Sequence, residues 1–375
     1  MTELHRAARA LTLVPGQPPI IDAAILVRNE TIIEVGTYAD LSRTFSGRTV
    51  DHHDATLVPA LINAHCHLEL SHLEGQTING TGFVPWVEHL LSLPLMDPDP
   101  ETVREACRKM KRSGTAMVGD IATRFPETMA GILQETGLFF VSFAEAIGEQ
   151  IPDSTIPGGH YELGRHSAAG HSLYTTHTKL LQAAKQETTA RNLPFSLHLS
   201  EHEDELNIML GNQSDFLDML QSRGRLLDFN PPGKRPVQHA NDLGLLDKQT
   251  LAIHCVQLDE ADIQILAKTG ATVCLCPRSN RFIGVGRAPW EKLHQANIPL
   301  CLGTDSIASN HDLNLWNEAL YLKQHWQGRL ELEDILKMMA PNPARILGED
   351  RLGTIEPGKA ARFAKVPQDV LEAFR

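Results

Sequence analysis

The chain has 375 residues, of which 42% are hydrophobic, and its formal net charge at pH 7 is -12. Proteins that bind nucleic acid need a basic surface for the phosphates, so this charge argues against nucleic acid as a partner. The first residues lack an apolar run of signal-peptide length, and no later segment has the length and apolarity of a membrane span, which predicts a cytoplasmic protein. The six cysteines lie scattered in apolar stretches without zinc-knuckle spacing, so we expect neither disulfides nor a cysteine metal site.

The first 56 residues are typical of β-structure. Two β-branched runs within Ile25–Val35 flank a polar turn at Arg28–Glu30, and this pattern predicts a β-hairpin. At the other end of the chain, Gly353–Gly358 is rich in turn residues and is also strand-like. We therefore expect both ends of the chain to be mainly β.

From residue 57 onwards, apolar strands alternate with helices. The eight expected strands are Leu57–Ala64, Ala116–Ile121, Leu138–Ala144, His171–Thr175, Phe195–Ser200, Leu251–Val256, Thr272–Cys276 and Leu300–Asp305. The helices expected between and after them include Glu101–Arg112, Pro126–Glu135, Thr178–Ala190, Glu260–Ala267, Trp290–Ala296 and Leu313–Gln327. Eight such strands favour an α/β fold of the (β/α)8 TIM-barrel type over an open sheet. No Gly-x-Gly-x-x-Gly segment follows the first strand, which disfavours a dinucleotide-binding fold.

Side chains that can bind a metal or move a proton stand at the ends of four expected strands. His65 and His67 follow the first strand, and residues two apart in an extended chain point to the same side. The other three strands contribute His198, Glu201, His254 and Asp305. Barrel enzymes collect their catalytic groups from several strands at this carboxyl rim, and histidine is a preferred ligand of zinc-like ions. The pattern predicts a metal-dependent active site.

Five segments at these strand ends carry a family resemblance: Leu57–His67, Leu197–Glu201, Ile253–Cys255, Cys276–Asn280 and Leu302–Ser306. Through them the whole chain resembles the amidohydrolase superfamily, in particular its aminohydrolase branch of cytosine-, guanine- and adenosine-type deaminases and triazine hydrolases. The resemblance implies a TIM barrel over residues 57–348 and a small β-sandwich formed by residues 1–56 and 349–375. The family's closing turn matches 353–359, whereas 360–363 departs from its common acidic form.

The resemblance also implies one divalent metal with four ligands: His65, His67, His198 and Asp305. Three imidazoles and one carboxylate leave room for a water molecule. Zinc is the first choice and iron the alternative, because this ligand set suits both ions. Binuclear members use a bridging lysine at the end of the fourth strand. The expected fourth strand, His171–Thr175, contains no lysine, and the first lysine after it is Lys179. One metal is therefore expected.

Three of the residues receive catalytic functions from the resemblance. Glu201 would carry a proton from water to a ring nitrogen of the substrate, and Asp305 would help to orient the water and pass a proton to the leaving ammonia. His254 would polarise the water or the edge of the ring. Two plainer interpretations stay open: a surface carboxylate at a helix start for Glu201, and a packed core histidine for His254.

Four residues are expected to contact the substrate. Glu69 follows His67 in a His-Leu-Glu segment similar to that of aminodeoxyfutalosine deaminases, and it is a candidate contact for ribose hydroxyls. His171 begins a segment that resembles one in S-adenosylhomocysteine and adenosine-type deaminases, where the histidine reaches the sugar. Ser309, four residues after Asp305, occupies the place of a serine that touches the base in that group. Trp86 can stack on an aromatic ring or pack on the barrel lip. Weaker candidates for an anionic substrate group are Arg124, Arg278 and Arg281.

The resulting hypothesis is hydrolytic deamination of an adenine nucleoside, preferably 6-aminodeoxyfutalosine of the alternative menaquinone route. The partner is then a small nucleoside-like molecule, with no nucleic acid and no membrane; a homodimer is an open possibility, since barrels of this branch are often dimers. Alternatives that share the site are S-adenosylhomocysteine or adenosine deamination, cytosine or guanine deamination, and triazine dechlorination. Other classes are amide or lactam hydrolysis, for which a bridged metal pair is usual, and a non-catalytic barrel.

Overall fold

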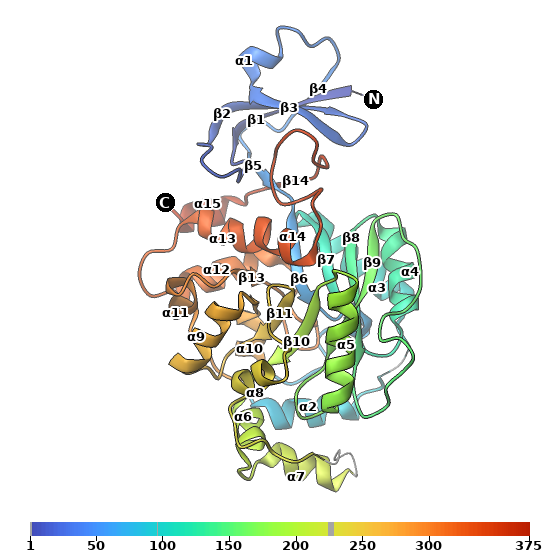
Figure 1. Ribbon diagram of the computed structural model, residues 1–375. Coiled ribbons are helices and arrows are strands. Elements are labelled where there is room, and N and C mark those ends of the chain that lie inside the picture. Colours follow the sequence, from blue (N-terminus) through green and yellow to red (C-terminus); the bar gives the residue numbers. More distant parts are fainter. Residues whose placement is uncertain (1, 96, 224–228) are drawn as a thin grey trace.

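The computed structural model describes residues 2–95, 97–223 and 229–375, and within them the strands form two sheets (Figure 1). The larger sheet has eight strands that pair in sequence order, and every pair is parallel. Its strands are β6 (Leu61–Cys66), β7 (Thr115–Ala122), β8 (Phe139–Ala146), β9 (Gly164–Gly170), β10 (Phe195–Leu199), β11 (Thr250–His254), β12 (Thr272–Leu275) and β13 (Leu300–Leu302). Their side chains are almost all buried, as expected for a parallel sheet that is covered on both faces.

The first and last strands of this sheet meet beyond the end of β13 and close the barrel. The backbone N–H groups of Thr304 and Asp305 each donate to the carbonyl oxygen of His65 over 3.1 Å. Beside them, Nδ2 of Asn63 donates to Oγ1 of Thr304 over 2.7 Å, and the N–H of Thr304 donates to Oδ1 of Asn63 over 3.1 Å. These bonds join residues about 240 positions apart and hold the ends of β6 and β13 together.

Helices follow the strands and cover the outside of the barrel (Figure 1). They are α3 (Pro100–Arg112), α4 (Pro126–Thr136), α5 (Thr178–Ala190), α9 (Glu260–Thr269), α11 (Trp290–Gln295), α12 (Leu315–His325), α13 (Leu332–Met339) and α14 (Pro341–Leu347). In α3, the Asp99 side chain accepts from the first backbone N–H groups and Pro100 stands at the first helical position. Its buried residues recur every three or four positions, which turns one face to the barrel.

A second group of helices lies at or near the carboxyl ends of the strands. It comprises the short 3-10 helix η1 (Leu68–Leu73) and α2 (Phe83–Ser92), α6 (Glu203–Leu210), α7 (Asp215–Ser222), α8 (Pro236–Asp242) and α10 (Pro277–Ile283). In Figure 1, α2, α6 and α7 stand at the end of the barrel opposite the small sheet. No helix in the described part of the chain has the length and apolarity needed to cross a membrane.

The smaller sheet is built from both ends of the chain. Its strands run in the order β14-β5-β1-β2-β3, with β4 also paired to β1, and it mixes parallel and antiparallel neighbours. The strands are β1 (Thr2–Ala10), β2 (Ile20–Arg28), β3 (Thr31–Thr37), β4 (Arg48–Asp51), β5 (Thr56–Pro59) and β14 (Phe363–Lys365), and the short helices α1 (Tyr38–Leu41) and α15 (Gln368–Ala373) lie in the terminal segments. The TIM barrel with an added β-structure from both chain ends is confirmed.

The predicted hairpin is confirmed as well. Strands β2 and β3 pair antiparallel, and both turn residues, Asn29 and Glu30, have positive φ angles of 49° and 63°. A two-residue turn with this backbone matches the twist of the strands that it connects. The turn contains no glycine, so two residues with side chains, Asn29 and Glu30, adopt left-handed backbone angles.

Three predicted elements differ from the structure. The expected first strand, Leu57–Ala64, is divided at Ala60, with β5 in the small sheet and β6 in the barrel. The C-terminal strand is β14, whereas Gly353–Gly358 forms turns. The expected fourth strand, His171–Thr175, is wrong: the strand is β9, and the predicted segment follows it.

The small residues of β9 explain that error. A Cβ atom on Gly164 would lie 2.4 Å from the ring of Phe140, and one on Gly170 would lie 2.3 Å from Leu181. Large side chains of neighbouring elements therefore fill the space beside this strand. Because large side chains of neighbouring elements pack against β9, the strand itself contains small residues and lacks the apolar run by which the other strands were predicted.

Candidate active site

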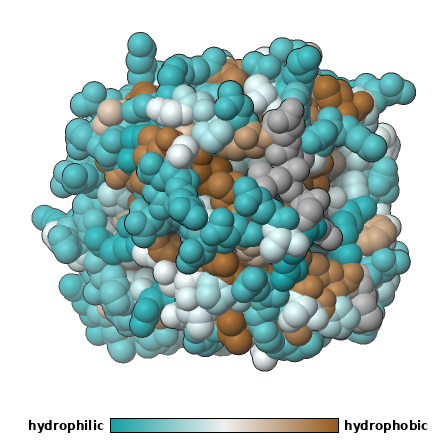
Figure 2. Space-filling view, turned by 90° about the horizontal axis from the view of Figure 1, so that it is seen from below, coloured by the Kyte–Doolittle hydropathy of each residue, from teal (hydrophilic) through white to brown (hydrophobic). Residues whose placement is uncertain are grey.

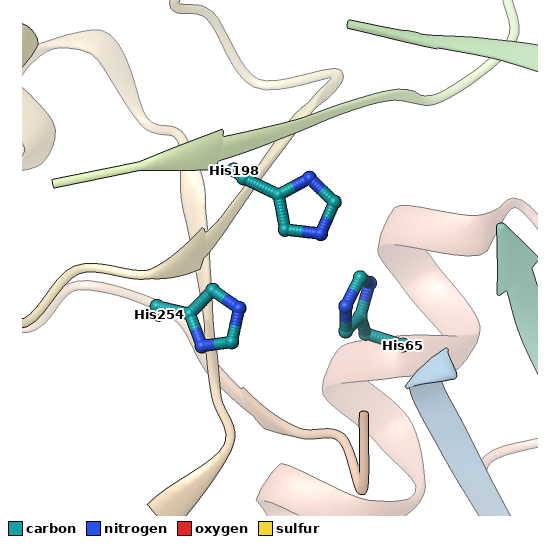
Figure 3. A group of neighbouring side chains, drawn as sticks. All are labelled: His65, His198 and His254. Atoms are coloured by element: carbon teal, nitrogen blue, oxygen red, sulfur yellow. The ribbon is translucent and has the colours of Figure 1, made fainter. Parts of the chain in front are cut away.

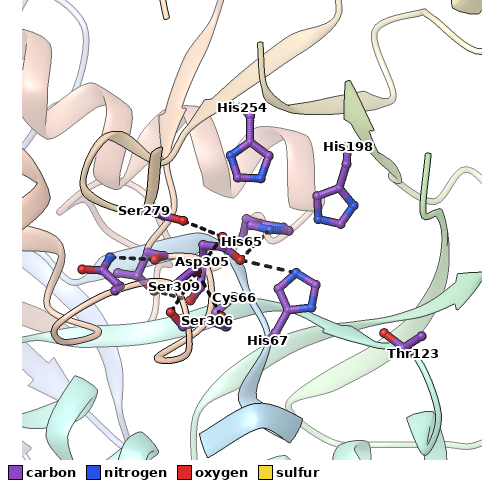
Figure 4. A network of polar contacts seen from close by, with 12 residues as sticks. His65, Cys66, His67, Thr123, His198, His254, Ser279, Asp305, Ser306 and Ser309 are labelled. Carbon is purple, nitrogen blue, oxygen red and sulfur yellow. Dashed lines mark hydrogen bonds and ion pairs between the residues drawn. The ribbon is translucent and has the colours of Figure 1, made fainter. Parts of the chain in front are cut away.

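Five of the predicted site residues meet at the carboxyl end of the barrel. His65 lies in β6 and His67 just after it, His198 lies in β10, His254 ends β11 and Asp305 follows β13. Figure 3 shows His65, His198 and His254 turned toward a common space from three different strands, and Figure 4 adds His67 and Asp305. The parallel strands bring their ends together, so residues far apart in sequence become neighbours.

The surroundings of His65 fit a bound metal ion. Its side chain is fully buried, and neither ring nitrogen has a hydrogen-bond partner among the described residues. Nε2 of His65 and Nε2 of His67 each lie 3.5 Å from Oδ1 of Asp305. Potential ligand atoms lie within 4.8 Å of one another in two groups that share His65, one with His67 and Asp305 and one with His198 and His254. Buried polar atoms require partners, and imidazole and carboxylate donors suit a zinc-like ion.

The protonation states at this cluster also suit a metal. Burial, followed by the charge of His65, lowers the pKa of His67 to about 3. Burial likewise lowers the pKa values of His65 and His198. Burial alone would raise the pKa of Asp305, but the close approach of His65, 3.5 Å away, and the charge of His67 hold this pKa well below its usual range. Neutral imidazoles and an ionised carboxylate are the forms in which these groups bind metals.

Hydrogen bonds from outside the cluster orient two of the candidate ligands. Nδ1 of His198 lies 3.0 Å from the carbonyl oxygen of His171, and a neutral imidazole that donates there keeps the lone pair of Nε2 for the cluster. The hydroxyls of Ser279 and Ser309 donate to Oδ2 of Asp305 over 2.7 and 2.8 Å. The Oδ1 atom of Asp305 is therefore the one that faces His65 and His67.

Glu201 and His254 form a pair beside this cluster. Nε2 of His254 lies 3.5 Å from Oε1 of Glu201, and its Nδ1 lies 2.9 Å from Oδ1 of Asn280. Because Nδ1 donates to Asn280, Nε2 of a neutral His254 is an acceptor. Burial, followed by the charge of Asp305, raises the pKa of Glu201 well above its usual range. A carboxyl group that holds its proton near neutral pH is suited to act as a general acid.

The backbone around Glu201 is held by Glu205, which the sequence analysis did not select. Ser200 has a positive φ of 54°, and its N–H and that of Glu201 donate to the two carboxylate oxygens of Glu205 over 2.9 and 2.7 Å. His254 and Asp305 also have positive φ angles, of 69° and 58°. Non-glycine residues in this region are strained, and such strain persists where the surroundings fix it.

A cavity of about 270 Å³ opens beside these groups. Helix α2 supplies its apolar wall with residues that include Phe83, Trp86 and Leu90, and Phe83 stacks on the ring of His202 at 3.6 Å. Figure 2 looks onto the end of the molecule that carries α2 and α7, and apolar surface gathers there in hollows between hydrophilic residues. The cavity is therefore polar at the metal-ligand cluster and apolar along α2.

The cavity contains three of the four predicted substrate contacts. Glu69, Trp86 and His171 all line it. Nε1 of Trp86 donates to a backbone carbonyl over 3.1 Å, and Nδ1 of His171 lies 2.6 Å from Oγ1 of Thr175. Ser309 is fully buried behind Asp305 and is absent from the cavity wall, so the structure does not bring it to the substrate side.

The three candidate arginines are separated. Arg124 lines the cavity, whereas Arg278 and Arg281 line a different hollow. The two terminal guanidinium nitrogens of Arg278, Nη1 and Nη2, donate to the carboxylate of Asp312 over 2.8 and 2.9 Å. Only Arg124 of these three is therefore on the substrate side.

Two polar cavity residues at the ends of β7 and β8 were not predicted, although their position is a signal. Glu145 stands near the carboxyl end of β8, the third barrel strand, and Thr123 directly follows β7. Both obey the rule that polar residues at strand ends face the site. Burial raises the pKa of Glu145 to about 7. Neither β7 nor β8 ends in a histidine or aspartate, the residue types that marked the predicted site.

The profile of the Amidohydrolase family matches residues 56–374 of this chain. The chain belongs to the amidohydrolase family. It is 28% identical over 391 aligned residues to the 5-methylthioadenosine/S-adenosylhomocysteine deaminase of Syntrophobacter fumaroxidans, a match that covers 94% of this chain and 81% of that protein. It is 25% identical over 348 residues to the aminodeoxyfutalosine deaminase of Deinococcus radiodurans, covering 86% and 81%. The zinc-bound adenosine deaminase structure from Xanthomonas campestris superposes with a TM-score of 0.82 at 26% identity, over 99% and 86% of the two chains.

The predicted resemblance is thus confirmed. This amidohydrolase is a hydrolase of carbon–nitrogen bonds, and its family is metal-dependent. The cluster around His65 offers a donor set that agrees with that requirement.

Proposed function

We propose that this amidohydrolase is a hydrolytic deaminase of an adenine nucleoside and that 6-aminodeoxyfutalosine is its preferred substrate. The observation that carries the proposal is the pair of Glu201 and His254, 3.5 Å apart, at the edge of the candidate metal cluster and in the wall of the cavity. A proton carrier of raised pKa beside a metal is the arrangement that hydrolysis of an aromatic amine needs.

In this proposal one divalent ion is held by His65, His67, His198 and Asp305. When bound, such an ion lowers the pKa of water and so supplies a nucleophile near neutral pH. Zinc is preferred over iron because the similar Xanthomonas campestris enzyme was solved with zinc bound. Both ions accept three imidazoles and one carboxylate, so metal analysis of the purified protein distinguishes them.

The chain's own residues would then move the protons. Protonated Glu201 donates to the ring nitrogen next to the carbon that carries the amino group, and it recovers a proton from the attacking water. Nε2 of His254 accepts a hydrogen bond from that water and orients it, since its Nδ1 donates to Asn280. Asp305 passes the second proton to the amino group. A C–O bond forms, the C–N bond breaks, and ammonia leaves.

The preference for aminodeoxyfutalosine rests on two features. Glu69 lies in the cavity two residues after His67, in the His-Leu-Glu segment that resembles aminodeoxyfutalosine deaminases. The apolar wall of α2 can accept a carboxyphenyl group on the 5′ side, and Arg124 lines the same cavity. A relative at 25% identity also bears that name.

The second candidate is deamination of 5-methylthioadenosine or S-adenosylhomocysteine. It is favoured by the relative from Syntrophobacter fumaroxidans, which aligns with more of this chain than the Deinococcus radiodurans protein does. Both candidates require the same adenine chemistry and differ only in the 5′ substituent. A cytoplasmic location and a homodimer stay predictions, for cell fractionation and light scattering to check.

The test is ammonia release from a substrate panel by the zinc-loaded protein. The panel contains aminodeoxyfutalosine, 5-methylthioadenosine, S-adenosylhomocysteine, adenosine, guanine, cytosine and a chlorotriazine. We expect the highest kcat/KM for aminodeoxyfutalosine and detectable turnover of the other adenine nucleosides. A higher kcat/KM for 5-methylthioadenosine or S-adenosylhomocysteine would overturn the substrate preference. Activity on guanine, cytosine or the triazine alone would overturn the nucleoside proposal.

A further inference from the structure

One carboxylate oxygen in the cavity wall has no donor. The side chain of Glu145 is 1% exposed, and its Oε2 accepts a hydrogen bond from Oγ1 of Thr123 over 2.7 Å. Its Oε1 has no hydrogen-bond partner among the described residues. A buried acceptor without a donor is costly, so such an atom in a cavity wall indicates that the ligand supplies the donor.

The neighbouring His198 does not supply that donor. Its Nδ1 lies 3.5 Å from Oε1 of Glu145, beyond hydrogen-bond range, and 3.0 Å from the carbonyl oxygen of His171. A neutral imidazole that binds a metal through Nε2 has a single N–H on Nδ1, and the carbonyl oxygen is its closer acceptor. Oε1 of Glu145 is therefore left for a molecule in the cavity.

Thr123 connects Glu145 to a second carboxylate, that of Glu69. The N–H of Thr123 donates to Oε1 of Glu69 over 3.3 Å, and the N–H of Arg124 donates to its Oε2 over 3.4 Å. The hydroxyl of the same threonine is the donor to Glu145. Both carboxylates line the same cavity as Thr123, and one residue fixes the two side chains relative to each other.

This pair lies to one side of the metal-ligand cluster. In Figure 4, Thr123 stands beyond His67, on the side away from Asp305 and His254. Glu201 has its partner on that other side, since its Oε1 lies 3.5 Å from Nε2 of His254. If the reacting ring of a substrate lies against Glu201, the group attached to that ring can reach the carboxylates of Glu145 and Glu69.

We propose that Glu145 and Glu69 together bind two adjacent hydroxyl groups on the sugar of the substrate. The inference rests on the proposed nucleoside chemistry and extends it to Glu145, to which no function was assigned above. A carboxyl oxygen that carries no proton is an acceptor, and two adjacent hydroxyls offer two donors. The pair selects a ribonucleoside over its deoxy forms, because a missing hydroxyl leaves a buried acceptor unpaired. It also disfavours a phosphate on either hydroxyl, because the ester replaces the O–H donor that the carboxyl oxygen needs.

The kinetic test uses Glu145→Gln with adenosine and with 2′,3′-dideoxyadenosine, in zinc-loaded protein. A hydrogen bond to a charged group corresponds to about a 10- to 100-fold change in affinity, so kcat/KM for adenosine should fall by about that factor, mainly through KM. The value for the dideoxy compound should stay within about threefold, since it has no hydroxyl to lose. Thr123→Val, which removes only the hydroxyl that aims Glu145, should give the same pattern with about a 3- to 10-fold loss. Equal losses on both substrates would overturn the proposal and assign Glu145 to support of His198.

A binding test is independent of turnover. The affinities of the zinc-loaded protein for inosine and for 2′,3′-dideoxyinosine are measured by calorimetry, with zinc content determined for each variant. The wild type should bind inosine about 10-fold or more tightly than the dideoxy compound, and Glu145→Gln should reduce this ratio. If no nucleoside releases ammonia but the ratio behaves in this way, the hydroxyl site is supported and the proposed reaction fails. If adenosine is deaminated and the wild type does not distinguish the two inosines, the hydroxyl site fails and the proposed reaction is kept.

Discussion

The hydroxyl of Ser309 donates a hydrogen bond of 2.8 Å to Oδ2 of Asp305, while Oδ1 of the same carboxylate lies 3.5 Å from Nε2 of both His65 and His67. Ser279 donates to the same Oδ2 over 2.7 Å. The two serines thus fix which oxygen faces the histidines. Their hydroxyls act on the orientation of Asp305, and Ser309 does so from a fully buried position.

The first prediction concerns Ser309→Ala. Loss of this hydroxyl frees Asp305 to rotate, and removal of a partner of a metal ligand typically weakens metal binding by about 10- to 100-fold. Zinc affinity, measured by competition with a chromogenic chelator, should fall by that factor. Ser222→Ala removes a hydroxyl from the surface end of α7 and should leave zinc affinity unchanged. Wild-type zinc affinity in Ser309→Ala would show that the bond does not orient the ligand.

The second prediction concerns Glu201→Gln. Glutamine keeps the size of the side chain but cannot exchange a proton, and positioned proton transfer contributes about 10²- to 10⁴-fold to rate. The kcat for the best nucleoside should fall by that factor, while the zinc content and the melting temperature stay close to wild type. The matched control is Glu203→Gln, an exposed carboxylate at the start of α6, which should keep full activity. Near-normal turnover by Glu201→Gln would refute the proposed mechanism.

The third prediction concerns Gly303, which lies at the seam between β6 and β13. A Cβ atom there would lie 2.8 Å from Cβ of His65, 2.9 Å from Sγ of Cys274 and 2.9 Å from the carbonyl oxygen of His65. Gly303→Ala should lower the free energy of unfolding by about 1–3 kcal/mol, the usual cost of overpacking, and should weaken zinc binding by shifting His65. Urea unfolding of the metal-free protein gives the first quantity, and zinc titration gives the second.

A glycine in helix α4 provides the control for this substitution. A Cβ atom on Gly131 would meet no atom within 4 Å. Gly131→Ala should therefore raise the free energy of unfolding by about 0.5–1 kcal/mol, because alanine is the better helix former. If both variants change stability in the same direction, close approach at the seam is not what requires Gly303.

The fourth prediction concerns pH and the small sheet. Nδ1 of His5 lies 3.0 Å from Nε2 of His52, and burial, followed by the charge of His5, lowers the pKa of His52 to about 4. In the unfolded chain an imidazole takes up a proton near pH 6.5. Between these two values the unfolded state binds more protons, so the free energy of unfolding should fall as the pH drops from 6.5 to 4, and this contribution should not change further below 4.

The variant His52→Gln should lose less of its unfolding free energy than the wild type between pH 7 and pH 4.5. Urea unfolding at the two pH values measures the difference. His53 is the matched control because its side chain is 82% exposed, so His53→Gln should respond to pH as the wild type does. An unchanged response in His52→Gln would mean that the His5–His52 pair does not contribute to acid sensitivity.

Much of the fold and of the candidate site was predictable because the signals are local. Runs of apolar residues marked seven of the eight barrel strands, and helical periodicity marked α3, α4, α5 and α9 within about two residues. His65 and His67 were recognisable from their spacing after a buried strand. The rule that parallel strands present functional groups at their carboxyl ends then selected His198, His254 and Asp305.

The sequence by itself therefore determined the barrel, the family and the group of side chains at the strand ends. Only the tertiary structure decided which of these side chains face the cavity and which stand behind it. In the folded chain Ser309 donates a hydrogen bond to Asp305, and Arg278 donates to Asp312. Thr123 donates to both Glu145 and Glu69 and so connects the two carboxylates. The fourth barrel strand is β9 and not the predicted segment His171–Thr175, because Phe140 and Leu181 from neighbouring elements fill the space beside its glycines. The periodicity of a strand or helix is a property of neighbouring residues, whereas the partner of a buried polar atom depends on how distant segments pack when the barrel closes.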